Sequence, residues 1–501
     1  MKKRICALTL ILFLLASVFN LVSCGDPESG QTETPQIPQQ GGGADENSEA
    51  SADEPPAEIL PDLPDADFGG AVVTFLTGMP FEGATGWSSH RDMFAEADIG
   101  EPLNDAVFYR NVEIQEKYNF EMKVVGQGDV NSSLRRSVRA GDNAYDMAIT
   151  WFEAAPALAF EGVFADLTQV PNINLSKPWW DQNANESLNI AGRLYFTTGD
   201  LTTQAIDAIA LLLFNKTLIQ DFGLENPYNF VRNNTWTMDR FLQMLKTPGV
   251  SRDLDGDGQM GLDDQYALTG SYRFPDFLFF AAGMKVTEND ASGIPQFVLN
   301  TPKTTELLNL AIEFMDPQLT MNQTAYNEGW TLAENMFANN RILFYGGVTQ
   351  HFARLRDMND SFGLLPLPKW DENQDRYYHQ VINVGGMMGL PSDISADRLS
   401  MVGHVIEALC AKSKYTLIPA YFDITLTNKL IRDEDSAEML GIIINSRSFC
   451  IGFMRDWGRL YSTAFNKNAM QGAPNFASAY ETAIEAAIAA RDSDMEAILT
   501  R

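Results

Sequence analysis

The sequence predicts an α/β fold in which helices flank parallel strands, and three observations support this prediction. Strand and helix patterns alternate along the chain from residue 70 onward. The first of these elements follow the order strand, helix, strand, helix, strand, which is typical of a parallel sheet covered by helices. The chain is also long enough, with 501 residues, to form two domains that each have their own core.

The first part of the body contains the patterns that define this order. Strands form short apolar or alternating runs, whereas helices repeat apolar residues every three or four positions. The expected strands are 71–76, 120–124 and 145–150, and the expected helices are 103–118 and 132–140. Gly141 directly follows the second helix, at the position where a glycine commonly ends a helix.

The same signals continue through the rest of the chain. Expected strands are 193–197, 208–214, 342–345 and 362–367, and expected helices begin near Thr237, Thr301, Thr331 and Asn475. Thr301 precedes a proline at the first helical position, and Thr331 forms a capping box with Glu334. The alternation of strands and helices therefore extends to the end of the sequence.

Residues 1–23 have the features of a secretory signal. A basic start precedes an uncharged apolar stretch, and small residues follow it. Cys24 ends the sequence Leu-Val-Ser-Cys, which resembles the lipobox where bacterial lipoproteins receive their lipid. We therefore expect a lipoprotein signal peptide, a lipid on Cys24, and anchoring at the extracytoplasmic face of the bacterial cell membrane. An uncleaved membrane helix is the alternative, although the apolar run is barely long enough to span a bilayer.

Residues 24–65 are expected to form a lipidated, disordered acidic linker. The region is rich in Asp, Glu, Pro, Gly, Gln and Ser and contains no Lys or Arg. Such a segment buries too little apolar surface to fold, and its like charges keep it extended. The formal net charge of the whole chain is -30, which argues against nucleic acid as a partner.

Five later segments follow one another in a distinctive order. They are 192–196 (GRLYF), 213–216 (LFNK), 334–347 (ENMFANNRILFYGG), 362–368 (FGLLPLP) and 384–390 (VGGMMGL). In this order and spacing, the segments resemble the extracellular solute-binding proteins of family 1, the maltose-binding type of sugar-binding lipoprotein in ABC transporters. The likeness extends over roughly residues 70–501 and is more specific for the fold than for the ligand.

This resemblance implies a two-lobed, periplasmic-binding-protein-like fold of class II type. Two α/β lobes are then joined by a hinge with three crossings, which the analogy puts near residues 203, 345 and 393. Lobe one comprises 66–203 plus 346–392, and lobe two comprises 204–345 plus 393–501. The resemblance further implies that the lobes close on a ligand bound between them.

A sugar ring has a polar rim and apolar faces, so its site needs aromatic rings and planar hydrogen-bonding groups. In open α/β sheets, ligands bind beyond the carboxyl ends of the strands. The candidate ligand-binding residues are Trp87, Trp151, Phe152, Glu153, Trp180, Asp200, Gln204, Tyr272, Arg273, Trp330 and Tyr345. Each has a structural alternative, which is core packing for the aromatic residues and a turn carboxylate for Asp200.

Residues 253–264 (DLDGDGQMGLDD) match the pattern of an EF-hand calcium loop. Acidic residues stand at loop positions one, three and five, a glycine at six and a carboxylate at twelve. The expected Ca²⁺ ligands are Asp253, Asp255, Asp257, the backbone carbonyl of Gln259, and Asp264. Position twelve is an Asp instead of the longer Glu, and an acidic solvated turn is the alternative. A bound Ca²⁺ would have a structural role, because a lone loop has no partner hand.

Together these features predict a monomeric, non-enzymatic binding protein that captures a sugar, an oligosaccharide in particular, for the permease subunits of an ABC importer. The four His residues lie far apart, and the sequence contains none of the His-Glu-x-x-His, Gly-x-Ser-x-Gly or phosphate-loop motifs. A surface adhesin or sensor and a glycan-degrading enzyme are the alternatives, the enzyme because the chain has carboxylates enough for a catalytic pair. The pairing of Cys410 with Cys450 also stays open.

Overall fold

The computed structural model describes residues 58–80, 86–326, 328, 331–355, 358, 360–427 and 434–501. The chain divides into two units, Met1–Gln36 and Ile37–Arg501, and every described residue belongs to the second. The expected signal peptide, Cys24 and Trp330 lie outside the described residues. Within the described part, no helix is long and apolar enough to cross a membrane.

The first sheet has the strand order β12-β3-β1-β2. Its strands are β1 (Ala71–Gly78), β2 (Phe120–Gln127), β3 (Met147–Trp151) and β12 (Gly386–Gly389). β1 pairs in parallel with β2 and β3, and β12 runs antiparallel to β3. This arrangement confirms the expected order of strand, helix, strand, helix, strand in the first part of the body.

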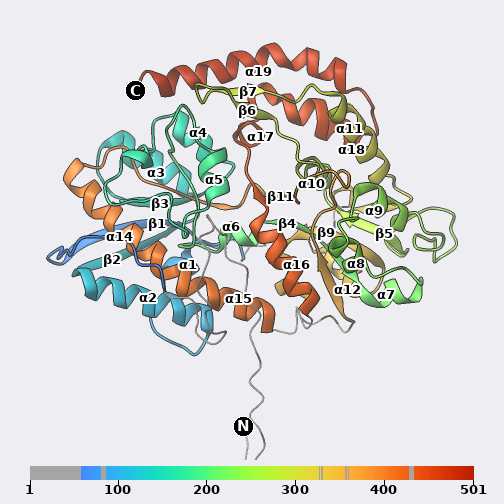
Figure 1. Ribbon diagram of the computed structural model, residues 1–501, viewed down its shortest axis with the longest axis horizontal. Coiled ribbons are helices and arrows are strands. Elements are labelled where there is room, and N and C mark those ends of the chain that lie inside the picture. Colours follow the sequence, from blue (N-terminus) through green and yellow to red (C-terminus); the bar gives the residue numbers. More distant parts are fainter. Residues whose placement is uncertain are drawn as a thin grey trace, which may run out of the picture. The chain divides into compact units, whose positions relative to one another are not determined.

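Helices cover this sheet, as the alternation of patterns predicts (Figure 1). They are α1 (His90–Met93), α2 (Pro102–Tyr118), α3 (Val130–Ala140), α4 (Ala155–Phe160) and α5 (Gln182–Ser187). The ends of α3 show why the chain forms a helix there. The Asp129 side chain accepts a hydrogen bond from the Ser132 amide at the start, and Gly141 adopts a left-handed conformation at the end. The expected role of Gly141 is confirmed.

The second sheet has the strand order β10-β4-β9-β5-β8. Its strands are β4 (Ala210–Asn215), β5 (Tyr266–Gly270), β8 (Thr320–Asn322), β9 (Ile342–Val348) and β10 (Phe362–Leu365). β9 pairs antiparallel with β4 and parallel with β5, so this sheet is mixed. All six residues of β4 are buried, as expected for a strand with both faces covered.

The helices beside the second sheet come from the middle of the chain. They are α7 (Lys216–Asp221), α8 (Pro227–Arg232), α9 (Met238–Leu245), α10 (Phe274–Ala281), α11 (Pro302–Phe314), α12 (Leu332–Ala338) and α13 (Phe352–Leu355), with the 3-10 turns η2 (Gln323–Ala325) and η3 (Thr349–His351). The fully buried Trp236, which precedes α9, donates a hydrogen bond from Nε1 to the Pro366 carbonyl. A short hairpin, β6 (Thr287–Asn289) and β7 (Pro295–Phe297), extends between α10 and α11.

The chain passes between the two sheets at positions that differ from those expected by analogy. It leaves the first sheet through α6 (Gln204–Asp207), directly before β4. The sequence places the second crossing near residue 345, but β9 continues through that residue inside the second sheet. The next strand, β10, also belongs to the second sheet, where it pairs with β4. The chain returns only at residues 381–385, before β12. Residues 346–385 therefore belong with the second sheet.

The third crossing also differs from its expected place near residue 393. α14 (Ala396–Tyr415) and α15 (Leu417–Thr427) both pack against α2 of the first sheet. Arg398 on α14 donates hydrogen bonds to the Asp146 carboxylate beside β3, which fixes this packing. The chain reaches the second sheet again at α16 (Glu434–Asn445), which packs against β10. Residues 393–427 therefore belong with the first sheet.

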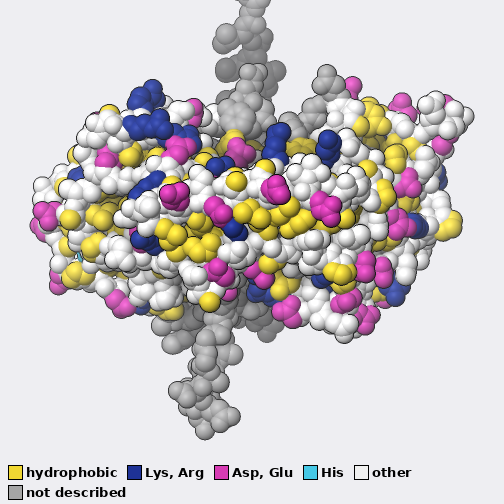
Figure 2. Space-filling view, turned by 90° about the horizontal axis from the view of Figure 1, so that it is seen from above, with side chains coloured by type: hydrophobic (Ala, Val, Ile, Leu, Met, Phe, Trp, Pro, Cys, Tyr) yellow, Lys and Arg dark blue, Asp and Glu magenta, His cyan; other side chains and the backbone are white. Residues whose placement is uncertain are grey.

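The C-terminal part completes the fold. After α16 come β13 (Arg447–Ser448), α17 (Ile451–Arg455), the turn η4 (Trp457–Arg459), the π-helical η5 (Ser462–Asn466), α18 (Lys467–Met470) and the long α19 (Phe476–Leu499). β13 pairs in parallel with β11 (His379–Gln380) as a two-stranded ribbon. Cys410 and Cys450 are both buried and unpaired. Figure 2 views the side that carries α19 and shows acidic, basic and apolar side chains interspersed.

Candidate ligand site

The carboxyl end of β3 is joined to the second passage, residues 381–385, by backbone and side-chain hydrogen bonds. Trp151, the last residue of β3, pairs with Gly386 in the ladder with β12. The Glu153 amide donates to the Asn383 carbonyl at 3.0 Å, and Asn383 Nδ2 donates to Glu153 Oε2 at 2.5 Å. These bonds hold Trp151 and Glu153 at a strand end, where the sequence places a ligand site.

Two buried glutamines extend this strand end. Gln204 starts α6 and is 1% exposed, and α6 packs against both β12 and η3. Gly386 leaves room for Gln204, because a Cβ at that glycine would lie 3.0 Å from Gln204 Oε1. Gln350 on η3 is 8% exposed and lies against Gly86, where a Cβ would overlap its Nε2. The two amides therefore occupy the junction of β3, β12, α6 and η3.

Several polar atoms at this junction have no hydrogen-bond partner among the residues that the structure describes. They are Gln204 Nε2, both amide atoms of Gln350, Asn383 Oδ1 and Thr150 Oγ1. Buried polar groups are nearly always hydrogen-bonded, to ordered water if not to protein. A water or a ligand hydroxyl is therefore expected beside these groups. They are uncharged and can both donate and accept, which suits a neutral polyhydroxylated ligand.

The structure gives three of the predicted aromatic residues a packing role. Phe152 is fully buried, and its ring packs edge-on against Phe449 with centroids 5.7 Å apart. Trp180 is 3% exposed and donates from Nε1 to Glu407 Oε2 at 2.9 Å. Tyr345 lies inside β9, where its hydroxyl meets His351 Nδ1 at 2.6 Å. These rings are enclosed, and the polar atoms of Trp180 and Tyr345 already have partners, unlike Gln204 Nε2. We therefore favour the core-packing alternative for these three residues.

Asp200 lies in a cluster of charged groups and not in an isolated turn. Its carboxylate is 3.7 Å from Lys414 Nζ, and the adjacent Asp181 carboxylate pairs with Arg447 at 2.7 Å. Burial raises the pKa of Asp200 to about 6, although Lys414 and Arg447 oppose the shift. Asp200 Oδ2 is buried and has no hydrogen bond to the residues that the structure describes. The charged neighbours give Asp200 a role in joining α14 and β13 to the segment after Gly199.

The remaining predicted residues lie on both sheets. Tyr272 and Arg273 follow β5 of the second sheet, with the Arg273 guanidinium 4.8 Å from the centre of the Tyr272 ring. Tyr272 is 36% exposed, so its ring can meet a ligand. Trp87 is half-buried next to Gly86, which brings it near Gln350.

Sequence reasoning missed Gln350, Asn383 and Thr150. Thr150 directly precedes Trp151, and the run of Val384, Gly385 and Gly386 signals close backbone approach. These signals do not specify which distant residues approach, so they give no reason to select Asn383 or Gln350. The structure supplies that information through the pairing of Trp151 with Gly386 and the packing of α6 on η3.

The predicted calcium loop forms an exposed acidic turn before β5. Asp253, Asp255 and Asp257 each offer a carboxylate oxygen, and these oxygens lie within 4.8 Å of one another. The Gly258 and Gly256 amides lower the pKa of Asp253 through hydrogen bonds. The Asp257 amide also lowers the pKa of Asp255, but burial and the neighbouring carboxylates raise it overall. The repulsion among these carboxylates is the kind that a divalent cation relieves.

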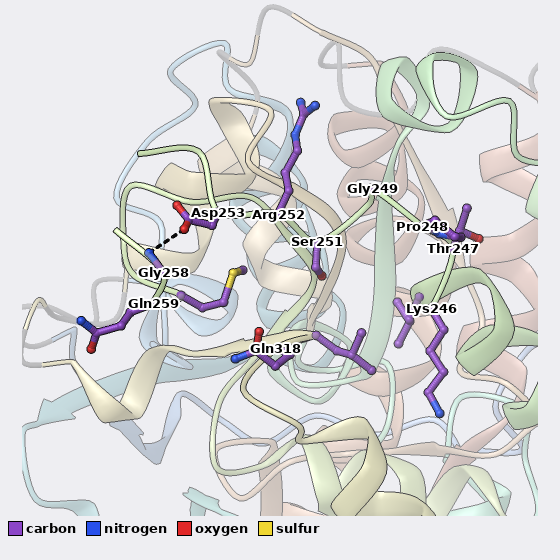
Figure 3. Close-up of a pocket in the computed structure, with 13 residues that line it drawn as sticks. Lys246, Thr247, Pro248, Gly249, Ser251, Arg252, Asp253, Gly258, Gln259 and Gln318 are labelled. Atoms are coloured by element: carbon purple, nitrogen blue, oxygen red, sulfur yellow. Dashed lines mark hydrogen bonds between the residues drawn. The ribbon is translucent and has the colours of Figure 1, made fainter. Parts of the chain in front are cut away.

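Asp264 does not join that cluster. It is 1% exposed, and its two oxygens accept hydrogen bonds from the Leu254 amide at 2.7 Å and the Gly261 amide at 2.6 Å. Asp264 therefore closes the loop by binding its backbone, and its assignment as a metal ligand gives way to this role. A pocket of roughly 380 Å³ lies beside the loop, with Ser251, Met260 and Gln318 in its lining and the hydrogen bond between Asp253 and Gly258 at its edge (Figure 3).

Comparison with known proteins relates this fold to one family. Residues 112–402 match the family model described as bacterial extracellular solute-binding protein. No curated protein matches the sequence. A cyclo/maltodextrin-binding protein complexed with maltotetraose is 15% identical with a TM-score of 0.55, and the match covers 85% of this chain and 98% of that one. The galacto-N-biose/lacto-N-biose I-binding protein of the ABC transporter from Bifidobacterium longum is 12% identical with a TM-score of 0.54, over 85% and 98% of the two chains.

Proposed function

Because the chain belongs to the family of bacterial extracellular solute-binding proteins, we propose that it captures an oligosaccharide and presents it to the permease of an ABC importer. Its two-lobed α/β fold is that of the periplasmic-binding-protein-like sugar-binding proteins. The proposed site is the junction of β3, β12, α6 and η3. In this proposal the protein is a binder without catalytic activity, held at the extracytoplasmic face by a lipid on Cys24.

The observation that carries the carbohydrate proposal is that Gln204 Nε2 and both amide atoms of Gln350 are buried and have no hydrogen-bond partner among the described residues. An amide offers both donors and acceptors, which matches a sugar hydroxyl that also donates and accepts. Trp151 adds an aromatic surface at the same strand end. Two proteins of the same fold were solved with maltotetraose and with lacto-N-biose, which supports a carbohydrate as the ligand class.

The test is calorimetric titration of residues 25–501, which keep every described element, with maltotetraose, lacto-N-biose and ribitol, and with an uncharged tetrapeptide. We expect measurable binding of a carbohydrate and none of the peptide. Gln204→Leu removes one or two neutral hydrogen bonds, so affinity should fall about fivefold to about thirtyfold at roughly 1 kcal/mol per bond. Gln169→Leu, at an exposed position of the 3-10 turn η1 (Leu167–Gln169), is the matched control and should bind as wild type.

Two results would contradict the carbohydrate proposal. One is binding of the peptide but of no carbohydrate. The other is carbohydrate binding that Gln204→Leu and Gln169→Leu affect equally, since the ligand would then lie away from α6. Release of new reducing ends from a bound glycan would instead favour an enzyme.

We also propose that Asp253, Asp255 and Asp257 bind a structural Ca²⁺, with the Gln259 carbonyl as a further ligand. Ca²⁺ prefers oxygen ligands and tolerates irregular geometry. Ca²⁺ should raise the melting temperature of the wild type above its value in chelator, and Asp255→Asn should reduce this shift. Asp239→Asn, an exposed carboxylate on α9, is the control. Equal melting temperatures with Ca²⁺ and with chelator would contradict the proposal.

A further inference from the structure

The two sheets meet a second time through residues that belong to none of the three passages. On the first-sheet side, these residues are the end of α4 and the turn at 189–193. On the second-sheet side, they are the β6–β7 hairpin, α17, η4 and α19. Figure 1 shows α19 extending along one side of the structure, from α11 and α18 towards α4. We call this set of contacts the second junction.

The tip of the β6–β7 hairpin contacts the first-sheet turn through its backbone. The Ala191 amide donates to the Gly293 carbonyl at 2.9 Å, and Asn289 Nδ2 donates to the Asn189 carbonyl at 2.7 Å. The approach is so close that a Cβ on Gly293 would lie 2.8 Å from Ala191 Cα. Gly293 also has a φ of +78°, so a glycine is required there on two grounds. The two hydrogen bonds and the required glycine make this a specific contact between the hairpin and the first-sheet turn.

Two arginines cap helices across the second junction in opposite directions. Arg193, from the first-sheet turn, donates from Nη1 to the Ile498 carbonyl at 2.6 Å, in the last turn of α19. Arg501, which follows α19, donates to the Ala159 and Phe160 carbonyls at 3.2 and 2.5 Å, at the end of α4. The last carbonyls of a helix lack the usual amide partner within the helix, so each arginine adds a hydrogen bond at a helix end. The Ala159 and Ile498 carbonyls also accept from the Gly162 and Arg501 amides, at 3.0 and 3.4 Å.

Apolar packing supports the polar contacts. Phe160 of α4 is 4% exposed, and its ring centroid lies 5.9 Å from that of Trp457, which is 1% exposed. Trp457 is held in turn by a hydrogen bond from Nε1 to Asp494 Oδ2 on α19 at 2.7 Å. Rings excluded from water on both sides stabilise the contact through the apolar area they bury.

We propose that the second junction stays closed whether or not ligand is bound, and that the lobes rotate about the line that joins it to the passages. Two rigid bodies that are attached at two separate places can rotate only about the axis through both. Opening therefore separates the sheets on one side of this axis only. This restricts ligand entry to that side and leaves α19 and the hairpin in place during exchange.

Pulsed electron paramagnetic resonance distances in residues 25–501 without ligand test this proposal, so the result does not depend on the ligand's identity. Spin labels at Glu186→Cys and Ser292→Cys, both exposed, span the second junction. Labels at Glu116→Cys and Asp239→Cys, also exposed, span the two sheets on α2 and α9. The native Cys410 and Cys450 are buried and should not be labelled. We expect one narrow distance for the first pair and a broader distribution for the second.

The double variant Arg193→Met, Arg501→Met should broaden the distance across the second junction. The matched control is Arg232→Met, Arg341→Met, because the ion pairs described for these arginines join carboxylates away from the second junction. The control should keep the narrow distance. If the double variant does not fold, the two single variants give the same comparison. Either of two results would overturn the proposal. One is a wild-type distance distribution across the second junction that is as broad as that of the second label pair. The other is a distribution for the double variant that is as narrow as that of its control.

Discussion

Asp276 provides a quantitative test of how the second sheet accommodates a buried charge beside Tyr272 and Arg273. It lies in the first turn of α10, is 5% exposed, and accepts hydrogen bonds from the Tyr461 hydroxyl and Asn466 Nδ2, both at 2.8 Å. Burial raises its pKa to about 6, because the hydrogen bonds offset only part of the loss of hydration. Asp276→Asn keeps an acceptor oxygen and removes the ionisation.

The sign of the effect follows from proton linkage. The pKa of Asp276 is raised in the folded state, so that state keeps a proton which the unfolded chain releases between pH 3.8 and about 6. Protonated Asp276 therefore contributes its full stabilisation of the folded wild type below pH 3.8, and this contribution is lost as the pH rises to about 6. A shift of about 2 pKa units corresponds to about 3 kcal/mol. Relative to wild type, Asp276→Asn should gain about this free energy of unfolding between pH 4 and pH 7.

Urea denaturation of residues 25–501 at several pH values measures this difference. Titrating groups that do not interact with Asp276, such as Asp200, contribute equally to both proteins and cancel. Any loss of packing caused by the amide is independent of pH and shifts the whole difference curve. Glu121→Gln, an exposed carboxylate on β2, is the control and should give a flat difference. An equally flat difference for Asp276→Asn would refute the assigned pKa and its cause.

Three further outcomes follow from the packing. In urea denaturation, Gly458→Ala should lower the free energy of unfolding by about 1–3 kcal/mol more than Gly472→Ala. Both glycines have a positive φ, but only a Cβ at Gly458 would meet the α19 backbone, at 2.5 Å. A thiol reagent should react with Cys410 and Cys450 only after unfolding, since both are buried and free; reaction in the native protein would contradict their burial. Phe152→Leu should cost about 1–2 kcal/mol of stability with ligand affinity unchanged in calorimetry, and a loss of affinity alone would restore Phe152 as a ligand contact.

Local patterns predicted the elements of the first sheet because their causes are local. β1 and β3 follow from short apolar runs, and the end of α3 follows from Gly141. The segment 193–197 is different, since it makes only isolated bridges at Arg193 and Thr197. Its apolar residues are buried by packing against the first sheet without a continuous ladder, which a residue pattern does not distinguish from a strand.

The crossings were misplaced because a local signal had a distant cause. Gly346 and Gly347 suggest the end of a strand, yet both lie inside β9. A Cβ on Gly346 would lie 2.5 Å from the Phe274 ring, and one on Gly347 would lie 2.7 Å from His351 Nδ1. These glycines are required by side chains that pack on the strand from elsewhere in the fold. Only the three-dimensional structure shows that these two glycines are required by side-chain packing and not by a turn.

The candidate site shows the same division between local and long-range information. Trp151 was predictable because a strand end is a local property, and Gly386 could be recognised as a place of close approach. The residue that approaches Gly386 is Gln204, and this depends on how α6 crosses between the sheets. Gln350 and Asn383 likewise lie where the chain leaves or enters a sheet. In this fold the passages decide which polar groups meet, so substitutions there should change ligand affinity more than changes to aromatic residues such as Phe152, which fill the core.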